Sequence, residues 1–409
     1  MLLFVVEDRH AERPLRDALA SAARSGTDTA VLTADALLAM ELKRDGVDAR
    51  LTTDGLTRER VDAFDRVALD AVAAAYGDKA RHYALVHGAA FGDYLEYTLI
   101  PSFVRAVRNV SAVVAALHAS PAPDALVLVG GGALVAAARL VEQHRRIRTD
   151  TVAGSFFHRA MQAAARLAAG RATRWVNSEF RALVLEPGFI WLLFLEGFRQ
   201  RLLGGPPSPI AAAPLIVVGD RFTADVVARL RGGRSIVLAG ATQPGRAMFG
   251  TSADLRPIES FTELPDLGRC LGSVVEAISD TIAMFRDPGL GRAFSIEGVP
   301  GWSLVRHTAA LHIATWVPAL RHLQALTLRA AAKAPGAALL TSTDVTAYNR
   351  LIIETLRRSG IASTGIQHGI VGQANGHDSI RVDRLAAWGD ATERTYRQWA
   401  ARPRVTLRA

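Results

Sequence analysis

The chain has 409 residues, of which 50% are hydrophobic and 21% are charged. A single hydrophobic core stops growing at roughly 250 to 300 residues, so this length predicts two domains, and the composition excludes a disordered or fibrous protein. The formal net charge of +9 comes almost entirely from scattered arginines. They reflect either the bias of a GC-rich genome or attraction to phosphate-bearing partners, and without a block of like charge we expect no nucleic-acid partner.

The single cysteine, Cys270, excludes a disulfide framework and a cysteine-based metal site, and it fits a reducing compartment. The opening apolar run, Leu2 to Val6, is short and acidic residues follow it at once. We interpret this run as a first β-strand rather than a signal peptide, and we expect a cytoplasmic protein.

The first part of the chain alternates between strand and helix patterns. Apolar runs at Leu2 to Val6, Thr29 to Thr33 and Asp124 to Val129 indicate strands, and Arg58 to about His118 indicates a long, interrupted helical stretch. Strands that alternate with helices form mainly parallel sheets covered on both faces. Residues 1–150 are therefore predicted to be a Rossmann-like βα domain.

A glycine turn joins the strand ending at Val129 to a helix beginning near Ala133. Gly130, Gly131 and Gly132 would let backbone amides approach an anion at the start of that helix, which makes them candidate substrate-binding residues. Their spacing does not match the G-x-G-x-x-G pattern, so a turn packed tightly for structural reasons is the alternative.

Residues 151–205 combine arginines with Phe, Trp and Leu, which predicts a basic amphipathic helical insertion. This insertion either lies on an anionic membrane face or packs on its own domain. Its most apolar run, Phe189 to Leu195, is too short to span a bilayer. The proline-rich stretch from Gly204 to Pro214 that follows is a predicted linker.

Residues 206–409 resume the strand–helix alternation and form the second predicted Rossmann-like domain. Within it we expect helices at Leu267 to Phe285 and Leu304 to Ala332, with strands beginning near Leu215 and Gly336. Asp344 is placed at a helix N-cap, and Gly360 at the end of the same helix.

Three consecutive strands of this second domain end in polar residues. Thr343 and Asp344 follow one predicted strand, Gln367, His368 and Gly369 follow the next, and Trp388 lies near the end of a third. The carboxyl ends of parallel strands share one edge of the sheet, where ligands bind. We therefore expect these residues to lie along a common edge.

The segments "LLTSTDVTAYNRLIIETLRRSGIASTGIQHGIVG" and "DSIRVDRLAAWGD" resemble bacterial surface-polysaccharide glycosyltransferases of the GT-B type, including capsule, polysialyl and teichoic-acid-like polymerases. In that family a strand ends in Gln-His-Gly, and a strand ending in Trp-Gly follows. The resemblance is specific over about 50 residues. It implies a GT-B-like α/β fold with Rossmann-like parallel sheets, and a glycosyltransferase, or a truncated part of one, that acts in capsule or cell-envelope synthesis.

The resemblance implies transfer of a sugar or polyol phosphate from a nucleotide donor to a glycan hydroxyl. His368 is the candidate catalytic residue, because a neutral imidazole accepts the hydroxyl proton and a charged one stabilises phosphate. A histidine with a purely structural role at the strand end is the alternative. The candidate substrate-binding residues of this domain are Gln367, Gly369, Thr343, Asp344 and Arg350.

The resemblance implies no cofactor and no metal; a nucleotide-sugar or CDP-polyol donor acts as substrate. The expected partners are that donor, a glycan or lipid-linked acceptor, and an anionic membrane at the inner face of the cell membrane. Family members continue into a donor-binding Rossmann domain where this sequence ends, so we expect a fragment or a protein without its donor half. The alternative functions are a non-catalytic binding module for a glycan or lipid-linked acceptor, and a nucleotide-sugar epimerase.

Overall fold

The structure is a computed structural model that describes residues 1–76, 85–86, 89–90, 92–119, 121–152, 186–204, 215–218, 221–230, 236–239, 249, 255–342, 344, 346–367, 381–399 and 406–408. The chain divides into two compact units. Unit 1 contains residues 1–80, 99–179 and 285–309, and unit 2 contains residues 81–98, 180–284 and 310–409. Each unit is therefore assembled from separated stretches of the sequence.

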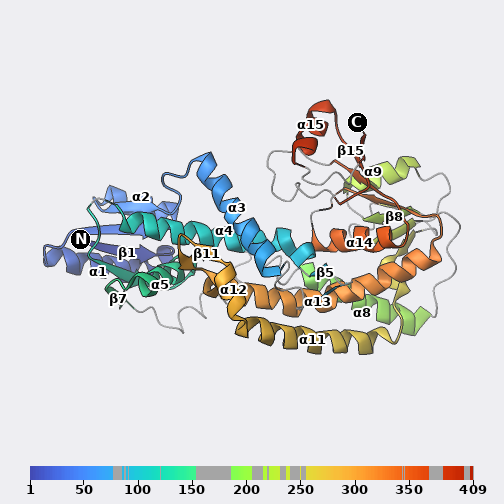
Figure 1. Cartoon of the computed structure of the whole chain (residues 1–409), viewed down its shortest axis with the longest axis horizontal. Coiled ribbons are helices and arrows are strands. Elements are labelled where there is room, and N and C mark those ends of the chain that lie inside the picture. The colour runs from blue at the N-terminus through green and yellow to red at the C-terminus, as the bar shows by residue number, and fades with distance from the viewer. Residues whose placement is uncertain are drawn as a thin grey trace. The chain divides into compact units, whose positions relative to one another are not determined.

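Unit 1 is built around the strands and helices at the start of the chain (Figure 1). Its strands are β1 (Leu2–Val6), β2 (Thr29–Thr33), β3 (Asp48–Leu51), β6 (Ala125–Val129) and β7 (Thr149–Val152), with a hairpin of β11 (Ser295–Ile296) and β12 (Val299–Pro300). Its helices are α1 (Glu12–Arg24), α2 (Ala36–Arg44), α3 (Arg58–Tyr76), α5 (Ala133–Arg145) and α12 (Pro288–Ala293). A 3-10 turn at Arg9–Ala11 precedes α1. Unit 1 also contains most of α4 (Gly92–Leu117).

The five-stranded sheet of unit 1 is parallel throughout and has the order β3-β2-β1-β6-β7. Phe4 and Val6 of β1 pack with Leu15 of α1 and Leu38 of α2 in one core. The alternate residues of β1 face the other side of the sheet and are also buried. The strands are apolar without interruption because both faces of this sheet are covered.

Unit 2 contains the second sheet. Its strands are β8 (Leu215–Val218), β9 (Ile236–Ala239), β10 (Leu255–Pro257), β13 (Ala338–Thr341), β14 (Ser363–Ile366), β15 (Arg384–Ala386) and β16 (Thr406–Arg408), with a hairpin of β4 (Leu85–Val86) and β5 (Ala89–Ala90). Its helices are α8 (Glu186–Gly204), α9 (Arg221–Leu230), α14 (Ala347–Arg358), α15 (Asp390–Trp399) and a 3-10 helix η4 (Ile258–Phe261), with most of α11 (Asp266–Arg286) and α13 (Trp302–Lys333).

The sheet of unit 2 has seven parallel strands in the order β10-β9-β8-β13-β14-β15-β16. Val217, Ile236 and Leu340 of its central strands pack with Ala224 and Val227 of α9. The pairing of β8 with β13 is the point where the chain turns from one side of the sheet to the other. Together the two parallel sheets confirm the predicted α/β, Rossmann-like class.

One predicted helix start is wrong. Helix α14 has Thr346 as its N-cap, because the Thr346 side chain accepts a hydrogen bond from the Asn349 N–H, whereas Asp344 lies before the helix. The predicted end of this helix at Gly360 is confirmed. Gly360 adopts a φ of 76°, and the Ile361 N–H donates to the carbonyl of Leu356, closing the helix as glycine caps commonly do.

Within the predicted insertion, residues 151–205, the structure describes the end of β7 and helix α8. Ile190, Leu193 and Phe194 of α8 are buried in unit 2. Gly197 lies against η4 so closely that a Cβ there would meet the Glu259 carbonyl oxygen at 2.6 Å. The remaining face of α8 exposes four leucines, which are Leu192, Leu195, Leu202 and Leu203. This helix thus packs on its own unit through one face; the predicted linker lies largely outside the described residues.

Among the described helices, one stretch, Leu99–Leu117 of α4, is long and apolar enough to cross a membrane. Within unit 1, however, 67% of its most apolar window is buried. Core helices of proteins that never enter a bilayer have the same length and composition, so this stretch does not decide where the protein resides.

Unit 2 buries a polar cluster between α11 and α13. The Asp266 carboxylate is 2% exposed and accepts hydrogen bonds from Arg329 at 2.6 Å, from Arg269 at 3.1 Å and from the Glu263 N–H at 2.9 Å. His322 is 5% exposed and lies edge-on to Phe194. Burial lowers the pKa of His322 from 6.5 to about 4, although Asp266 acts to raise it.

We predict that His322 makes the stability of unit 2 depend on pH. Below its ordinary pKa of 6.5 the ring binds a proton in the unfolded chain, whereas the folded ring does so only near pH 4. The unfolded state then binds more protons, so about 3 kcal/mol of stability is lost as the pH falls through this window. His322→Phe should remove that loss in urea denaturation at a series of pH values. His144→Phe, on the exposed face of α5, is the control, and an unchanged pH profile in His322→Phe would contradict the assignment.

Candidate functional site

Three adjacent strands of unit 2 end along one edge of the sheet, which we call the unit 2 edge. In register, Thr341 of β13 pairs with Gly365 of β14, and Ile366 of β14 pairs with Ala386 of β15. All three strands run in the same direction, so the residues after them emerge side by side. This confirms the predicted adjacency of the strand ends, which is where ligands bind in open parallel sheets.

Gln367 joins two of these strand ends. Its side chain is 5% exposed, and its Oε1 accepts a hydrogen bond of 2.7 Å from the Trp388 N–H. Its own N–H donates to the carbonyl of Ala386 at 3.0 Å. Gln367 therefore holds the start of the loop after β15, and the indole of Trp388, which is 62% exposed, projects from a fixed backbone.

Asp344 is held in a similar way. Its Oδ2 accepts a hydrogen bond of 2.6 Å from the Arg381 N–H, which lies in the segment before β15. Its carbonyl oxygen accepts a hydrogen bond of 3.3 Å from Nε of Arg350. Arg350 is 2% exposed, so it supports the loop from inside the unit. These contacts hold the side chains of Arg350 and Gln367 in place, and their predicted contact with substrate stays a prediction.

Three of the predicted site residues, Thr343, His368 and Gly369, lie outside the described residues. The described part of the edge therefore consists of Asp344, Gln367 and Trp388, with Arg350 and Arg381 supporting it. The predicted glycines Gly130 to Gly132 belong to unit 1, where they form a separate arrangement.

In unit 1 the corresponding position is the start of α5. The chain changes direction between β1 and β6, which is where a parallel sheet opens a crevice for ligands. Here Glu7, directly after β1, accepts a hydrogen bond of 2.5 Å from the Leu134 N–H in the first turn of α5. A side-chain carboxylate of the protein thus occupies the place at which a helix N-terminus would bind an external anion.

The glycine turn makes room for this carboxylate. Gly132 has a φ of 119°, and a Cβ at this position would lie 2.7 Å from Cγ of Glu7. Gly130 has a φ of 76° and approaches the side chain of Ala11. Close packing against the side chains of unit 1 accounts for these two glycines. This agrees with the alternative interpretation of the sequence, in which the turn is tightly packed for structural reasons.

The environment of Glu7 shifts its pKa. Burial raises its pKa above 4.5, and the neighbouring Asp8 acts in the same direction. The hydrogen bond from Leu134 and the charges of Arg105 and Arg108 lower the pKa only in part. Arg108 itself has its pKa lowered by burial and by Arg105. Perturbed titratable groups at a switch point are candidates for a functional site.

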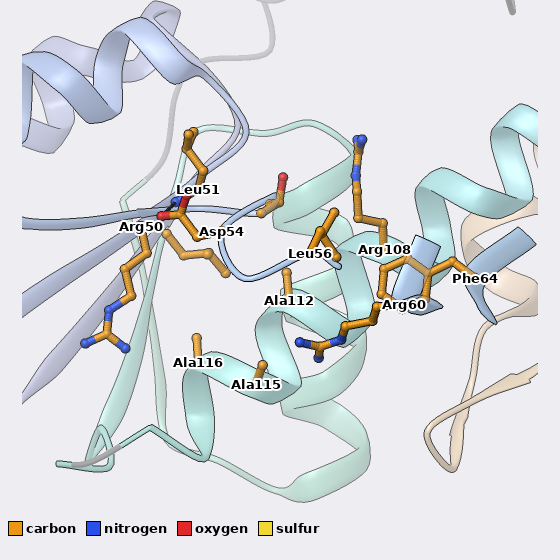
Figure 2. Close-up of a pocket in the computed structure, with 12 residues that line it drawn as sticks. Arg50, Leu51, Asp54, Leu56, Arg60, Phe64, Arg108, Ala112, Ala115 and Ala116 are labelled. Atoms are coloured by element: carbon orange, nitrogen blue, oxygen red, sulfur yellow. Dashed lines mark hydrogen bonds between the residues drawn. The ribbon is translucent and has the colours of Figure 1, made fainter. Parts of the chain in front are cut away.

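A small pocket of about 140 Å³ lies near the ends of β2 and β3. Arg50, Arg60 and Arg108 contribute to its lining, and Ala112 and Ala116 of α4 form its floor. Figure 2 shows that the guanidinium groups of Arg50 and Arg108 point toward opposite ends of the pocket, so the three cations do not converge. Arg50 is also paired with Asp48 at 2.6 Å. The pocket therefore does not form a single anion site.

No family model and no curated protein sequence matches this chain. The arrangement therefore has to be interpreted from its own chemistry. The unit 2 edge offers an exposed aromatic ring after β15 and a half-buried carboxylate after β13, with β14 between these two strands. Such an edge can bind a planar ring by stacking and hold hydroxyl groups by hydrogen bonds.

The sequence does not reveal the hydrogen-bond partners of Asp344 or Glu7. Arg381 is unremarkable in the sequence, and no local pattern indicates that its N–H meets Asp344, 37 positions away. Glu7 directly follows the first apolar run of the chain, but nothing in the sequence indicates that it meets Leu134, 127 positions away. The proximity of these residues follows from the strand order, which a single sequence does not reveal.

We predict that Glu7→Gln becomes increasingly more stable than the wild type as the pH rises above 4.5. A carboxyl whose pKa is raised in the folded state contributes stability below its unfolded pKa, and that contribution is lost as the pH rises through the folded pKa. Glutamine keeps an oxygen for the Leu134 N–H but cannot ionise. Urea denaturation at acidic and neutral pH measures the difference, with Asp17→Asn on α1 as the control. A difference that does not change with pH would contradict the prediction.

Proposed function

We propose that this protein is a glycosyltransferase of the GT-B type, which transfers a sugar or polyol phosphate from a nucleotide donor to a surface-polysaccharide acceptor. The observation that carries the proposal is the alignment of three strand ends at the unit 2 edge, with Asp344, Gln367 and Trp388 emerging together. Two Rossmann-like parallel sheets in one chain also support it. The residues that resemble the family, Gln367 to Gly369 and Trp388, follow adjacent strands of this edge.

The proposed transfer reaction requires a general base, an aromatic surface for stacking and a loop in a fixed position. His368 would accept the proton of the acceptor hydroxyl as its oxygen attacks the donor carbon or phosphorus. The bond to the nucleotide phosphate breaks, and the leaving phosphate takes the electron pair. Trp388 would stack on the nucleobase or sugar ring. Gln367 keeps Trp388 in place through its hydrogen bond to the backbone.

Two other functions remain as alternatives. A non-catalytic module for a glycan or lipid-linked acceptor would use the same edge for binding, and an exposed Trp388 suits that role equally. A nucleotide-sugar epimerase would act on the donor without any acceptor. The three functions differ in whether nucleotide is released and whether that release needs an acceptor.

We predict that the purified protein releases nucleotide from a nucleotide-sugar or CDP-polyol donor only when a glycan acceptor is present. His368→Ala should abolish this release without changing the free energy of unfolding. Trp388→Ala should lower it tenfold or more, since stacking on a ring is worth about 1–3 kcal/mol, while Trp388→Phe should keep most of it. The exposed Leu311 provides a control, Leu311→Ala.

Each alternative gives a different result in this assay. Saturable acceptor binding without nucleotide release would indicate the binding module. Conversion of a nucleotide sugar to its epimer without acceptor would indicate the epimerase. Loss of folding in His368→Ala would assign His368 to the core and remove the proposed base.

A further inference from the structure

Unit 2 contains a second candidate site, an open hollow of about 370 Å³ between α11 and α13. We call it the α11–α13 hollow. Its volume lies within the range of roughly 300–1,000 Å³ that is common for small-molecule sites. Its lining residues are Asp266, Arg269, Cys270, Ser273, Arg321, His322, Gln324, Ala325 and Leu328.

His322 supplies an independent sign that this hollow receives a ligand. Its side chain is 5% exposed, and its Nε2 has no hydrogen-bond partner among the described residues. A buried ring nitrogen without a partner is costly, so such atoms usually meet a water or a ligand. The hollow that His322 lines is much larger than the space one water occupies.

The charges around the hollow argue against an anionic ligand. Every described guanidinium beside it is already paired with a carboxylate; the pairs are Arg269 with Asp266, Arg329 with Asp266 and Glu263, and Arg321 with Glu276. The three guanidiniums are balanced by the three carboxylates Asp266, Glu263 and Glu276, so the cluster has no net positive charge to attract a phosphate or carboxylate. A neutral ligand can enter without breaking any of these ion pairs.

The other polar side chains that line the hollow are suited to hydrogen bonding with the hydroxyl groups of a ligand. Ser273 and Gln324 offer a hydroxyl and a carboxamide, each able to donate and to accept, and His322, whose Nε2 has no partner among the described residues, lines the same hollow. Ala325 and Leu328 provide an apolar wall on the same hollow. A ring or chain with several hydroxyl groups and an apolar face satisfies both kinds of surface, whereas a purely apolar ligand would leave His322 unsatisfied.

We propose that the α11–α13 hollow binds a neutral, polyhydroxylated compound, a sugar ring or a polyol, through Ser273, His322 and Gln324. This site is distinct from the unit 2 edge in its residues, and it does not rest on the proposed transferase function. It requires neither a nucleotide nor a transfer step, so it can fail or succeed independently.

The experiment measures binding of glycerol, ribitol, D-glucose and N-acetyl-D-glucosamine to the full chain by saturation-transfer NMR, with inorganic phosphate and glucose 6-phosphate as anionic comparisons. We expect at least one neutral probe to bind saturably below roughly 10 mM, the weak end of specific recognition. Ser273→Ala should weaken that binding about three- to tenfold, the factor expected for one net hydrogen bond. Ser279→Ala, on the exposed face of α11, should not change it.

The variant His322→Phe and the alkylation rate of the Cys270 thiol test whether the probe binds in this hollow. His322→Phe keeps an aromatic ring against Phe194 but removes Nε2, and it should weaken binding by a similar factor. Burial raises the pKa of the Cys270 thiol to about 11. Alkylation of this single cysteine is therefore slow, and a bound probe should slow it further.

Three results would overturn the inference. The first is the absence of saturable binding by any neutral probe at this concentration. The second is binding by phosphate or glucose 6-phosphate alone. The third is neutral-probe binding that both Ser273→Ala and His322→Phe leave unchanged. If His322→Phe does not fold, Ser273→Ala with its Ser279→Ala control decides the question.

Discussion

The parallel pairing of β13, β14 and β15 is the constraint on which the candidate site depends. Parallel strands in register end at the same edge, so residues 20 to 40 positions apart in the chain become neighbours. Side chains reinforce the pairing at both edges. At the amino end Asp383 accepts hydrogen bonds from the N–H and the hydroxyl of Ser363, both at 2.8 Å. At the carboxyl end Gln367 accepts one from Trp388.

The buried charged groups of the two units have different partners. In unit 1 the carboxylate of Glu7 lies on the first turn of α5, so this helix start is already occupied by the protein's own anion. In unit 2 Asp266 is surrounded by arginines and a backbone N–H, while the neighbouring His322 stays neutral. Buried ion pairs of this kind add little net stability but fix geometry when every partner is present. The cluster in unit 2 lines the α11–α13 hollow.

The sequence predicts the architecture well where a single local pattern decides it. Apolar runs such as Leu2–Val6 and Leu215–Val218 are buried strands, and Gly360 ends a helix, as expected. It fails where two local signals compete, as for the N-cap of α14, where Thr346 rather than Asp344 bonds to the helix. Short polar strands such as Thr149–Val152 have no apolar run to predict them. The α11–α13 hollow combines residues about fifty positions apart, which no local pattern reveals.

The central claim, that Gln367 holds the strand ends of the unit 2 edge in one arrangement, is tested most directly by amide hydrogen exchange at Trp388. In the wild type, the Trp388 N–H should be protected because the Gln367 side chain accepts its hydrogen bond. In Gln367→Leu that protection should fall about tenfold or more, the range expected for a single buried hydrogen bond, while the amide of Leu385 within β15 stays protected. Equal and rapid exchange at Trp388 in both proteins would contradict the account.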